Sequence, residues 1–220
     1  LFSKKRAINR FKGFFEVCRY IDKHFIPVDG LAAYEDFLNS GGKLSNEGIR
    51  LAYQTSGHPI FALAEQWSIN VNKAIASIAL EDRIPFPYVY EAVEAVHAVA
   101  DIAVVSSAHN AAVTAEWEQA GLTKFVTGIF TQESGSKKQV IASLVQTGGY
   151  GSGCMLKLGD APGDLQAAQG NGVFFYPIIP EKEAESWQQF KDTYLRLFID
   201  GRYAEQERQL IDRFYSELED

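Results

Sequence analysis

Four short apolar runs, separated by amphipathic stretches, constrain the fold of residues 85–220. The first run reads Asp-Ile-Ala-Val-Val and ends at Ser106, and all four are short and bounded by small or polar residues. Runs of this kind are typical of parallel strands that are buried on both faces. Because they alternate with helical stretches, they predict an α/β fold with a doubly wound parallel sheet. The predicted strands are 101–105, 125–128, 154–158 and 173–176.

The helices between these runs are predicted from apolar residues that recur every three or four positions. They span residues 90–100, 111–120, 137–146 and 164–169, and two further helices are predicted within 181–220.

The first third of the chain has a different pattern. Phe11, Phe14 and Cys18 recur at helical spacing, and the alternation typical of strands is almost absent. Ser45 has the character of a helix N-cap, and a long helix is predicted over Phe61–Leu80. The composition changes near Pro85, so we expect an all-helical domain over residues 1–84 and an α/β domain with a C-terminal helical extension over 85–220.

Charge and hydropathy exclude several classes of protein. The net charge is -7, which disfavours nucleic acid and anionic membrane surfaces as partners, since both require a basic face. No apolar run approaches the roughly 20 residues of a spanning helix. Cys18 and Cys154 form no CxxC motif and are predicted to be reduced thiols. Because no signal peptide is evident, the expected location is cytoplasmic.

Polar side chains follow three of the predicted strands, where ligands bind in open α/β sheets. Hydroxyls and free N–H groups bind phosphate oxygens, and a lysine ammonium neutralises phosphoryl charge. Two carboxylates on a tight turn suit Mg²⁺, which prefers oxygen ligands. The pattern therefore predicts a site for phosphate and Mg²⁺. Its residues are Ser106, Ser107 and Asn110 after the first strand, Lys137 after the second, and Asp160 and Asp164 after the third.

Three segments resemble the motifs of a known superfamily. IAVVSSAHN, GSKKQVI and LKLGDAPGDLQAAQGNGVFFYP resemble, in order, the second, third and fourth motifs of haloacid dehalogenase-like (HAD-like) hydrolases. The resemblance covers roughly residues 85–180 and implies a Rossmann-like core. The helical first third resembles the helical cap of the capped members.

The resemblance also implies roles for individual residues. Ser106 would bind phosphate, with Ser107 and Asn110 as secondary contacts. Lys137, or alternatively Lys138, would be the catalytic lysine that contacts phosphate and nucleophile. The metal residues would be Asp160, as a direct ligand of Mg²⁺, and Asp164, as a ligand directly or through water.

The first motif of the superfamily is a strand that ends in DxD, and its first aspartate attacks phosphorus. The nearest match here, Phe25–Gly30, has proline in the place of the nucleophile and follows a helix, so it is interpreted as a turn between helices. In the superfamily this strand precedes the cap and lies at the centre of the sheet. We therefore expect it upstream of Leu1, and we expect a gap or an unusual filler at the centre of the sheet in residues 1–220.

Three functions are compatible with these patterns. The leading hypothesis is a Mg²⁺-dependent phosphatase of a small phosphorylated metabolite, a phosphoric monoester hydrolase that acts through an aspartyl-phosphate. The alternatives are a phosphosugar mutase on the same fold and an inactive protein that binds a phosphorylated ligand. His109 is either polar surface or a general base, and the sequence leaves the oligomeric state open.

Overall fold

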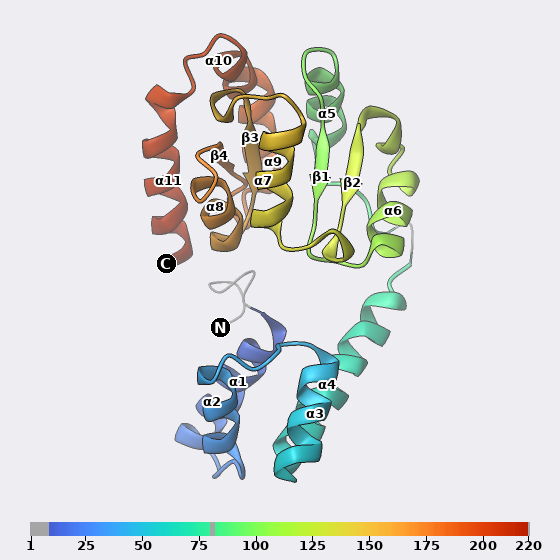
Figure 1. The fold of residues 1–220 in the computed structure, drawn as a ribbon, viewed down its shortest axis with the longest axis vertical. Helices are drawn as coiled ribbons and strands as arrows, with labels where there is room; N and C mark the ends of the chain where they lie inside the picture. Colours follow the sequence, from blue (N-terminus) through green and yellow to red (C-terminus); the bar gives the residue numbers. More distant parts are fainter. Residues whose placement is uncertain (1–8, 80–81, 220) are drawn as a thin grey trace. The chain divides into compact units, whose positions relative to one another are not determined.

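The computed structural model describes residues 9–79 and 82–219. The chain divides into two compact units, one over residues 8–79 and one over residues 80–220 (Figure 1). Leu80, the expected end of the long helix, lies outside the described residues. None of the described helices is long and apolar enough to cross a membrane.

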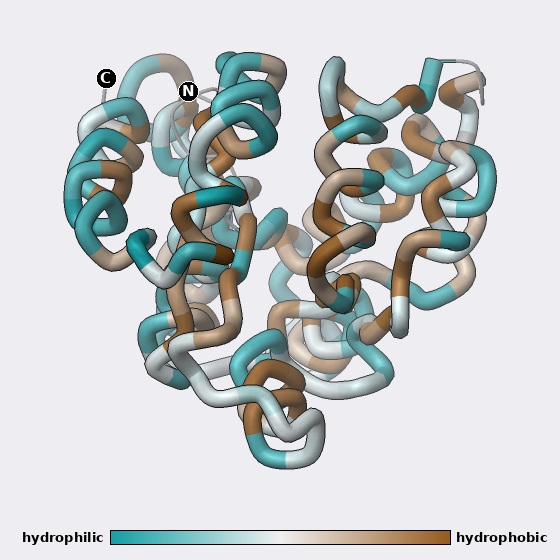
Figure 2. The backbone as a smooth tube through the Cα atoms, turned by 90° about the horizontal axis from the view of Figure 1, so that it is seen from above, coloured by the Kyte–Doolittle hydropathy of each residue, from teal (hydrophilic) through white to brown (hydrophobic). Residues whose placement is uncertain are grey.

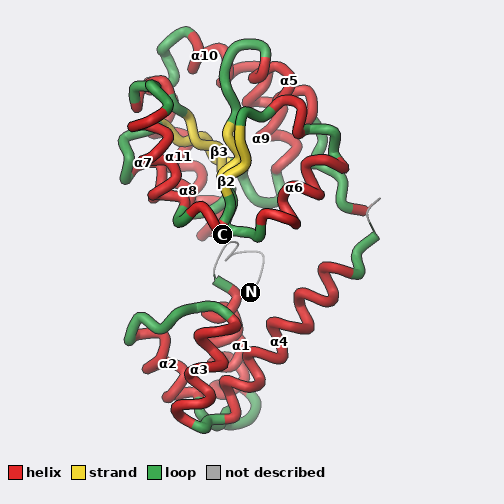
Figure 3. Tube along the Cα trace, turned by 45° about the vertical axis from the view of Figure 1, so that its right-hand side comes forward, coloured by secondary structure: helices red, strands yellow, loops and turns green. Residues whose placement is uncertain are grey.

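Residues 8–79 form a helical unit, and its described residues contain no strand (Figure 3). The helical character predicted for this part of the chain is therefore confirmed. The helices are α1 (Arg10–His24), α2 (Leu31–Asn39), α3 (Asn46–Ser56) and α4 (Pro59–Ala76). The helix predicted over Phe61–Leu80 is described from Pro59 to Ala76.

Local signals in the sequence fix the ends of these helices. The Ser45 side chain accepts a hydrogen bond from the backbone N–H of Gly48, so the predicted N-cap of α3 is confirmed. Gly57 ends α3 at φ 71°, a left-handed conformation that favours glycine. Pro59 then occupies the first turn of α4, where its missing N–H costs no hydrogen bond.

Aromatic rings fill the centre of the helical unit. The Tyr34 side chain is fully buried, and its ring centroid lies 5.5 Å from that of Phe14 and 5.2 Å from that of Phe61. Arg10 also joins α1 to α4, since its Nη1 donates to Asn72 Oδ1 over 2.6 Å. The buried residues of this core are Phe11, Phe14, Phe15, Cys18, Tyr34, Ile49, Ile60, Phe61 and Ala64.

Residues 80–220 alternate helices with strands, as the sequence predicts. The strands are β1 (Ala103–Val105), β2 (Gly128–Phe130), β3 (Leu156–Gly159) and β4 (Phe174–Pro177). The helices are α5 (Val89–His97), α6 (Asn110–Gln119), α7 (Lys137–Thr147), α8 (Pro162–Gln169), α9 (Glu183–Gln189), α10 (Leu195–Ile199) and α11 (Ala204–Glu219). A π-helical turn, η5 (Phe190–Tyr194), joins α9 to α10.

The strands form two separate parallel pairs. β1 pairs with β2, and Ala103 lies opposite Gly128. β3 pairs with β4, and Leu156 lies opposite Phe174. The parallel α/β class is confirmed. The described strands form two pairs that do not pair with each other, in agreement with the gap expected at the centre of the sheet. In Figure 1, β1 and β3 are the inner strands of the two pairs.

The predicted position of the second strand, 125–128, is wrong, because the observed strand is Gly128–Phe130. Residues 123–125 form a 3₁₀ turn, and the strand begins at Gly128. The reason is the burial of Phe125, whose ring packs against Tyr90 and against His97 of α5. Tertiary packing thus overrides the strand propensity of a short apolar run.

Neighbouring residues of β4 point into two different clusters. Phe175 packs in one with Leu165 of α8 and Phe214 of α11. Tyr176 packs in the other with Ala92 of α5 and with Phe190. Because successive side chains leave opposite faces of a strand, helices cover both faces of the β3–β4 pair. The helices present apolar residues among polar ones, as the alternating colours of Figure 2 show.

Two aliphatic residues of α3 test the core of the helical unit. Ile49 is fully buried, whereas Leu51 is 62% exposed. We expect Ile49→Ala to lower the free energy of unfolding by about 2–5 kcal/mol, because it removes buried methyl groups and leaves a cavity. Leu51→Ala is the matched control and should change it by less than about 0.5 kcal/mol. Urea unfolding followed by circular dichroism measures both, and equal losses would contradict the described core.

Candidate active site

A buried carboxylate held by two lysines lies at the carboxyl end of β3. The Asp164 side chain is 2% exposed, and its Oδ1 is 2.8 Å from Lys137 Nζ and 3.1 Å from Lys157 Nζ. A buried carboxylate is stable only when it is paired and hydrogen-bonded. The two ammonium groups supply that pairing, so the three side chains form one charged cluster.

The local sequence brings these groups together. Ser136 caps α7 by accepting from the N–H of Gln139, so Lys137 is the first residue of that helix. Asp164 lies in the first turn of α8, where the helix dipole favours a negative charge. At Gly159, a Cβ atom would lie 2.4 Å from the Cβ of Asp164, so only glycine permits this approach.

Lys157 enters the site from the middle of β3. Its side chain is 17% exposed, and its Nζ also donates to the carbonyl oxygen of Leu158 over 2.6 Å. Burial lowers the pKa of Lys157, while the nearby charge of Asp164 acts in the opposite direction. The sequence analysis missed this residue, although a charged side chain within the apolar run Met155–Gly159 was a signal for it.

Asp160 differs from Asp164 in its surroundings. It is exposed at the end of β3, so its carboxylate suits a hard cation that keeps several waters. Asp164 Oδ1 instead forms ion pairs with both ammonium groups, and the metal-binding roles of Asp160 and Asp164 stay predictions. Among the residues that the structure describes, no cluster of three or more histidine, cysteine or acidic side chains could hold a metal ion.

The loop after β1 is tied to the loop after β2. The carboxylate of Glu133 lies 3.2 Å from His109 and accepts from the backbone N–H of Asn110 over 3.4 Å. Hydrogen bonding, first from the Thr131 hydroxyl, holds the pKa of Glu133 down at about 2. His109 therefore has a structural partner.

The remaining phosphate-binding candidates make local contacts. Ser106 Oγ accepts from the N–H of Ala108 over 3.2 Å, and the side chain of Asn110 faces Thr114 on its own helix. Ser107 is exposed. The structure thus brings Lys137 and Asp164 together, while the roles of Ser106, Ser107 and Asn110 stay predictions.

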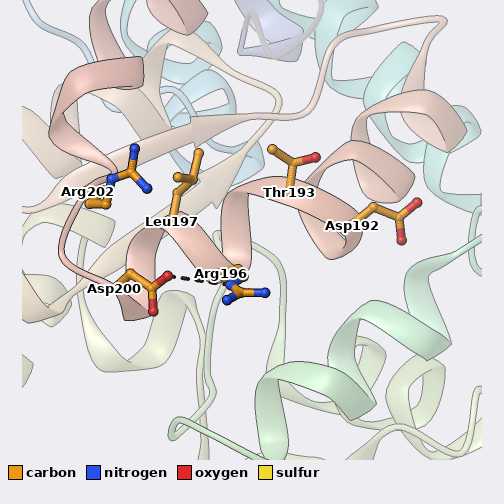
Figure 4. A pocket seen from close by; sticks show the side chains of 6 residues that line it. All are labelled: Asp192, Thr193, Arg196, Leu197, Asp200 and Arg202. Atoms are coloured by element: carbon orange, nitrogen blue, oxygen red, sulfur yellow. Dashed lines mark ion pairs between the residues drawn. The ribbon is translucent and has the colours of Figure 1, made fainter.

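The α/β unit also has a hollow of about 310 Å³ beside η5 and α10 (Figure 4). It shares no residue with the cluster around Asp164. Its charged groups include the ion pair of Arg196 with Asp200, 3.5 Å apart, and both side chains reach solvent. None of its lining residues lies at the end of a strand, and none is a lysine, so the hollow does not provide the lysine–carboxylate pair found at the end of β3. The lining residues are Asp192, Thr193, Arg196, Leu197, Asp200 and Arg202.

Residues 44–178 match the sequence model of a family described as haloacid dehalogenase-like hydrolase. The match spans more than half of the chain. The chain belongs to this hydrolase family. The resemblance of the three motifs is thereby confirmed, and the matched range includes all four strands and the cluster around Asp164. No curated protein matches the sequence.

The two aspartates of this HAD-like site should differ in their effect on stability. Asp164→Asn leaves two half-buried ammonium groups without their counter-charge, so we expect a loss of about 3 kcal/mol in the free energy of unfolding. Asp160→Asn, the exposed control, should change it by less than about 0.5 kcal/mol. Urea unfolding at neutral pH measures both, and similar values would show that Asp164 is not the buried anchor of the cluster.

Proposed function

We propose that this HAD-like hydrolase is a phosphatase of a small phosphorylated metabolite, in which Lys137 and Asp164 form the fixed part of the phosphate site. The observation that carries the proposal is their contact at the carboxyl end of β3, 2.8 Å between Nζ and Oδ1. An ammonium held in place by a buried carboxylate is positioned for the phosphoryl charge before the reaction begins.

The nucleophile in this proposal is an aspartate outside residues 1–220, at the end of a further strand. The two strand pairs support that placement. Residues of β1 and β3 are exposed or half-buried, whereas three of the four residues of β4 are buried. Parallel strands are normally covered and paired on both sides, so the edges of β1 and β3 that the described chain leaves without a strand suit one more strand between them.

The chemistry divides into two steps. A carboxylate oxygen of the added aspartate attacks phosphorus, the bond to the leaving oxygen breaks, and that oxygen takes a proton from the second aspartate of the added DxD segment. Water then gives a proton to this second aspartate and attacks phosphorus, the bond to the first aspartate breaks, and inorganic phosphate leaves with the first carboxylate regenerated. Lys137 neutralises the phosphoryl oxygens in both steps, and Ser106 donates a hydrogen bond to one of them. Asp160 and Asp164 would hold a Mg²⁺ ion, which would supply further charge neutralisation.

An assay of the protein with its upstream sequence tests this function. It is measured as phosphate release from a panel of phosphorylated metabolites, with Mg²⁺ and with a chelator. We expect Mg²⁺-dependent turnover, which Asp160→Asn abolishes and which Lys137→Ala lowers at least about 100-fold, because each group acts on charge that develops during transfer. Lys138→Ala, at the exposed neighbour on α7, is the matched control and should retain activity.

Residues 1–220 alone should release no phosphate, because the attacking carboxylate is absent. Robust hydrolysis by this chain would refute the external nucleophile. If the longer protein binds phosphorylated metabolites but never hydrolyses them, the inactive binding protein is the correct interpretation. Interconversion of phosphosugars without release of phosphate would instead identify a mutase.

A further inference from the structure

We propose that the start of α11 is a lock on the outer edge of β4. Tyr203 and Glu207 take both outward backbone groups of Phe175, and they thereby keep this edge from pairing with a strand of a second copy of the chain. The matched family range ends at residue 178, so the two side chains of the lock lie outside it. The lock does not depend on the proposed phosphatase.

The pairing of β4 with β3 defines which edge is the outer one. The N–H of Phe174 donates to the Met155 carbonyl over 3.0 Å, on the side of β3. The N–H of Ile178 donates to the Gly159 carbonyl on the same side, over 2.8 Å. Because the backbone groups of successive residues leave a strand in opposite directions, the N–H and the carbonyl of Phe175 both point away from β3.

Two side chains at the start of α11 occupy these outward groups. Glu207 Oε1 accepts from the N–H of Phe175 over 2.7 Å, and the Tyr203 hydroxyl donates to the carbonyl oxygen of Phe175 over 2.7 Å. Tyr203 is 1% exposed. Burial raises the pKa of Tyr203, so its hydroxyl keeps its proton and stays a donor. A helix thus supplies the acceptor and the donor that a neighbouring strand would otherwise supply.

On this outer edge, the described residues 173–177 offer no free N–H group. The N–H of Val173 donates to the carbonyl of Ala168 over 3.2 Å, and Pro177 has no N–H. Strands pair through donors and acceptors in alternation, so an edge without a free donor cannot complete a ladder. Proline and a covering helix are both features that protect sheet edges from pairing.

Further contacts hold the body of α11 beside β4 (Figure 1). The ring centroid of Phe214 lies 5.7 Å from that of Phe175, and Leu210 is buried. Arg213 Nη2 lies 3.0 Å from Glu185 Oε1 on α9. Because these contacts lie beyond the first turn, loss of the two hydrogen bonds should free that turn and leave the rest of the helix packed.

Hydrogen exchange of the Phe175 amide, measured by NMR relative to the amide of Ile129 in β2, tests the bond to Glu207. We expect Glu207→Met to raise this relative rate at least about tenfold, because a hydrogen bond to a charged group is lost. Glu205→Met is the matched control, at an exposed glutamate of the same turn, and should stay within about twofold of the parent. If Glu207→Met does not fold, Glu207→Gln keeps a neutral acceptor and should raise the rate about threefold.

Sedimentation velocity tests the closure of the edge. Tyr203→Phe combined with Glu207→Met leaves both outward groups of Phe175 without partners. We expect the mass of this variant to rise with concentration to about twice that of the parent, as two copies pair. The exchange of the Phe175 amide should then slow again, because the second copy takes its N–H. Tyr215→Phe combined with Glu205→Met changes two exposed residues of α11 and should sediment as the parent does.

Three results would overturn the lock. The first is an unchanged relative exchange rate of Phe175 in the folded Glu207 variant. The second is a double variant that sediments as the parent at every concentration, since the edge would then stay closed without the two bonds. The third is a dimer in which the Phe175 amide still exchanges rapidly, because a different surface would then pair. Phosphate release by the longer protein enters none of these measurements, so failure of the proposed phosphatase is read separately.

Discussion

The ion cluster of Asp164 with Lys137 and Lys157 organises the candidate site, because it joins three elements that are separate in the sequence. Lys137 begins α7, Lys157 comes from β3, and Asp164 lies in the first turn of α8. A carboxylate that is 2% exposed must be compensated inside the protein. Gly159 permits the close approach that this requires, since any side chain there would collide with Asp164. The cluster therefore couples the fold of the α/β unit to the electrostatics of the site.

The two parallel strand pairs are the second constraint. Helices cover both faces of the β3–β4 pair through Phe175 and Tyr176, yet β1 and β3 each pair on one edge only within the described chain. An edge strand leaves a row of backbone N–H and C=O groups without strand partners, and a further strand would pair them. The arrangement is consistent with a further strand between β1 and β3, which is where the proposed nucleophile would be delivered.

The family membership is shown by the sequence, whereas the reaction is a proposal. Membership of the haloacid dehalogenase-like hydrolases follows from the match over residues 44–178. The reaction on a phosphate ester, the use of Mg²⁺ and the role of the helical unit as a cap are proposals. For the site, the structure adds a distinction that the motif lacks, because Asp160 is exposed whereas Asp164 is buried against two lysines.

The sequence by itself determined the alternation of strands and helices after Pro85, the helical character of residues 9–79 and the order of the three motifs, because periodicity and capping are local properties. It also placed Lys137 at the start of a helix and Asp164 after a strand. Only the tertiary structure decided which strands pair with each other, that Phe125 packs on α5 rather than in a strand, and that Lys157 reaches Asp164. These outcomes depend on contacts between distant residues, and the spacing of residues along the chain does not encode how far a side chain reaches or which neighbour it meets.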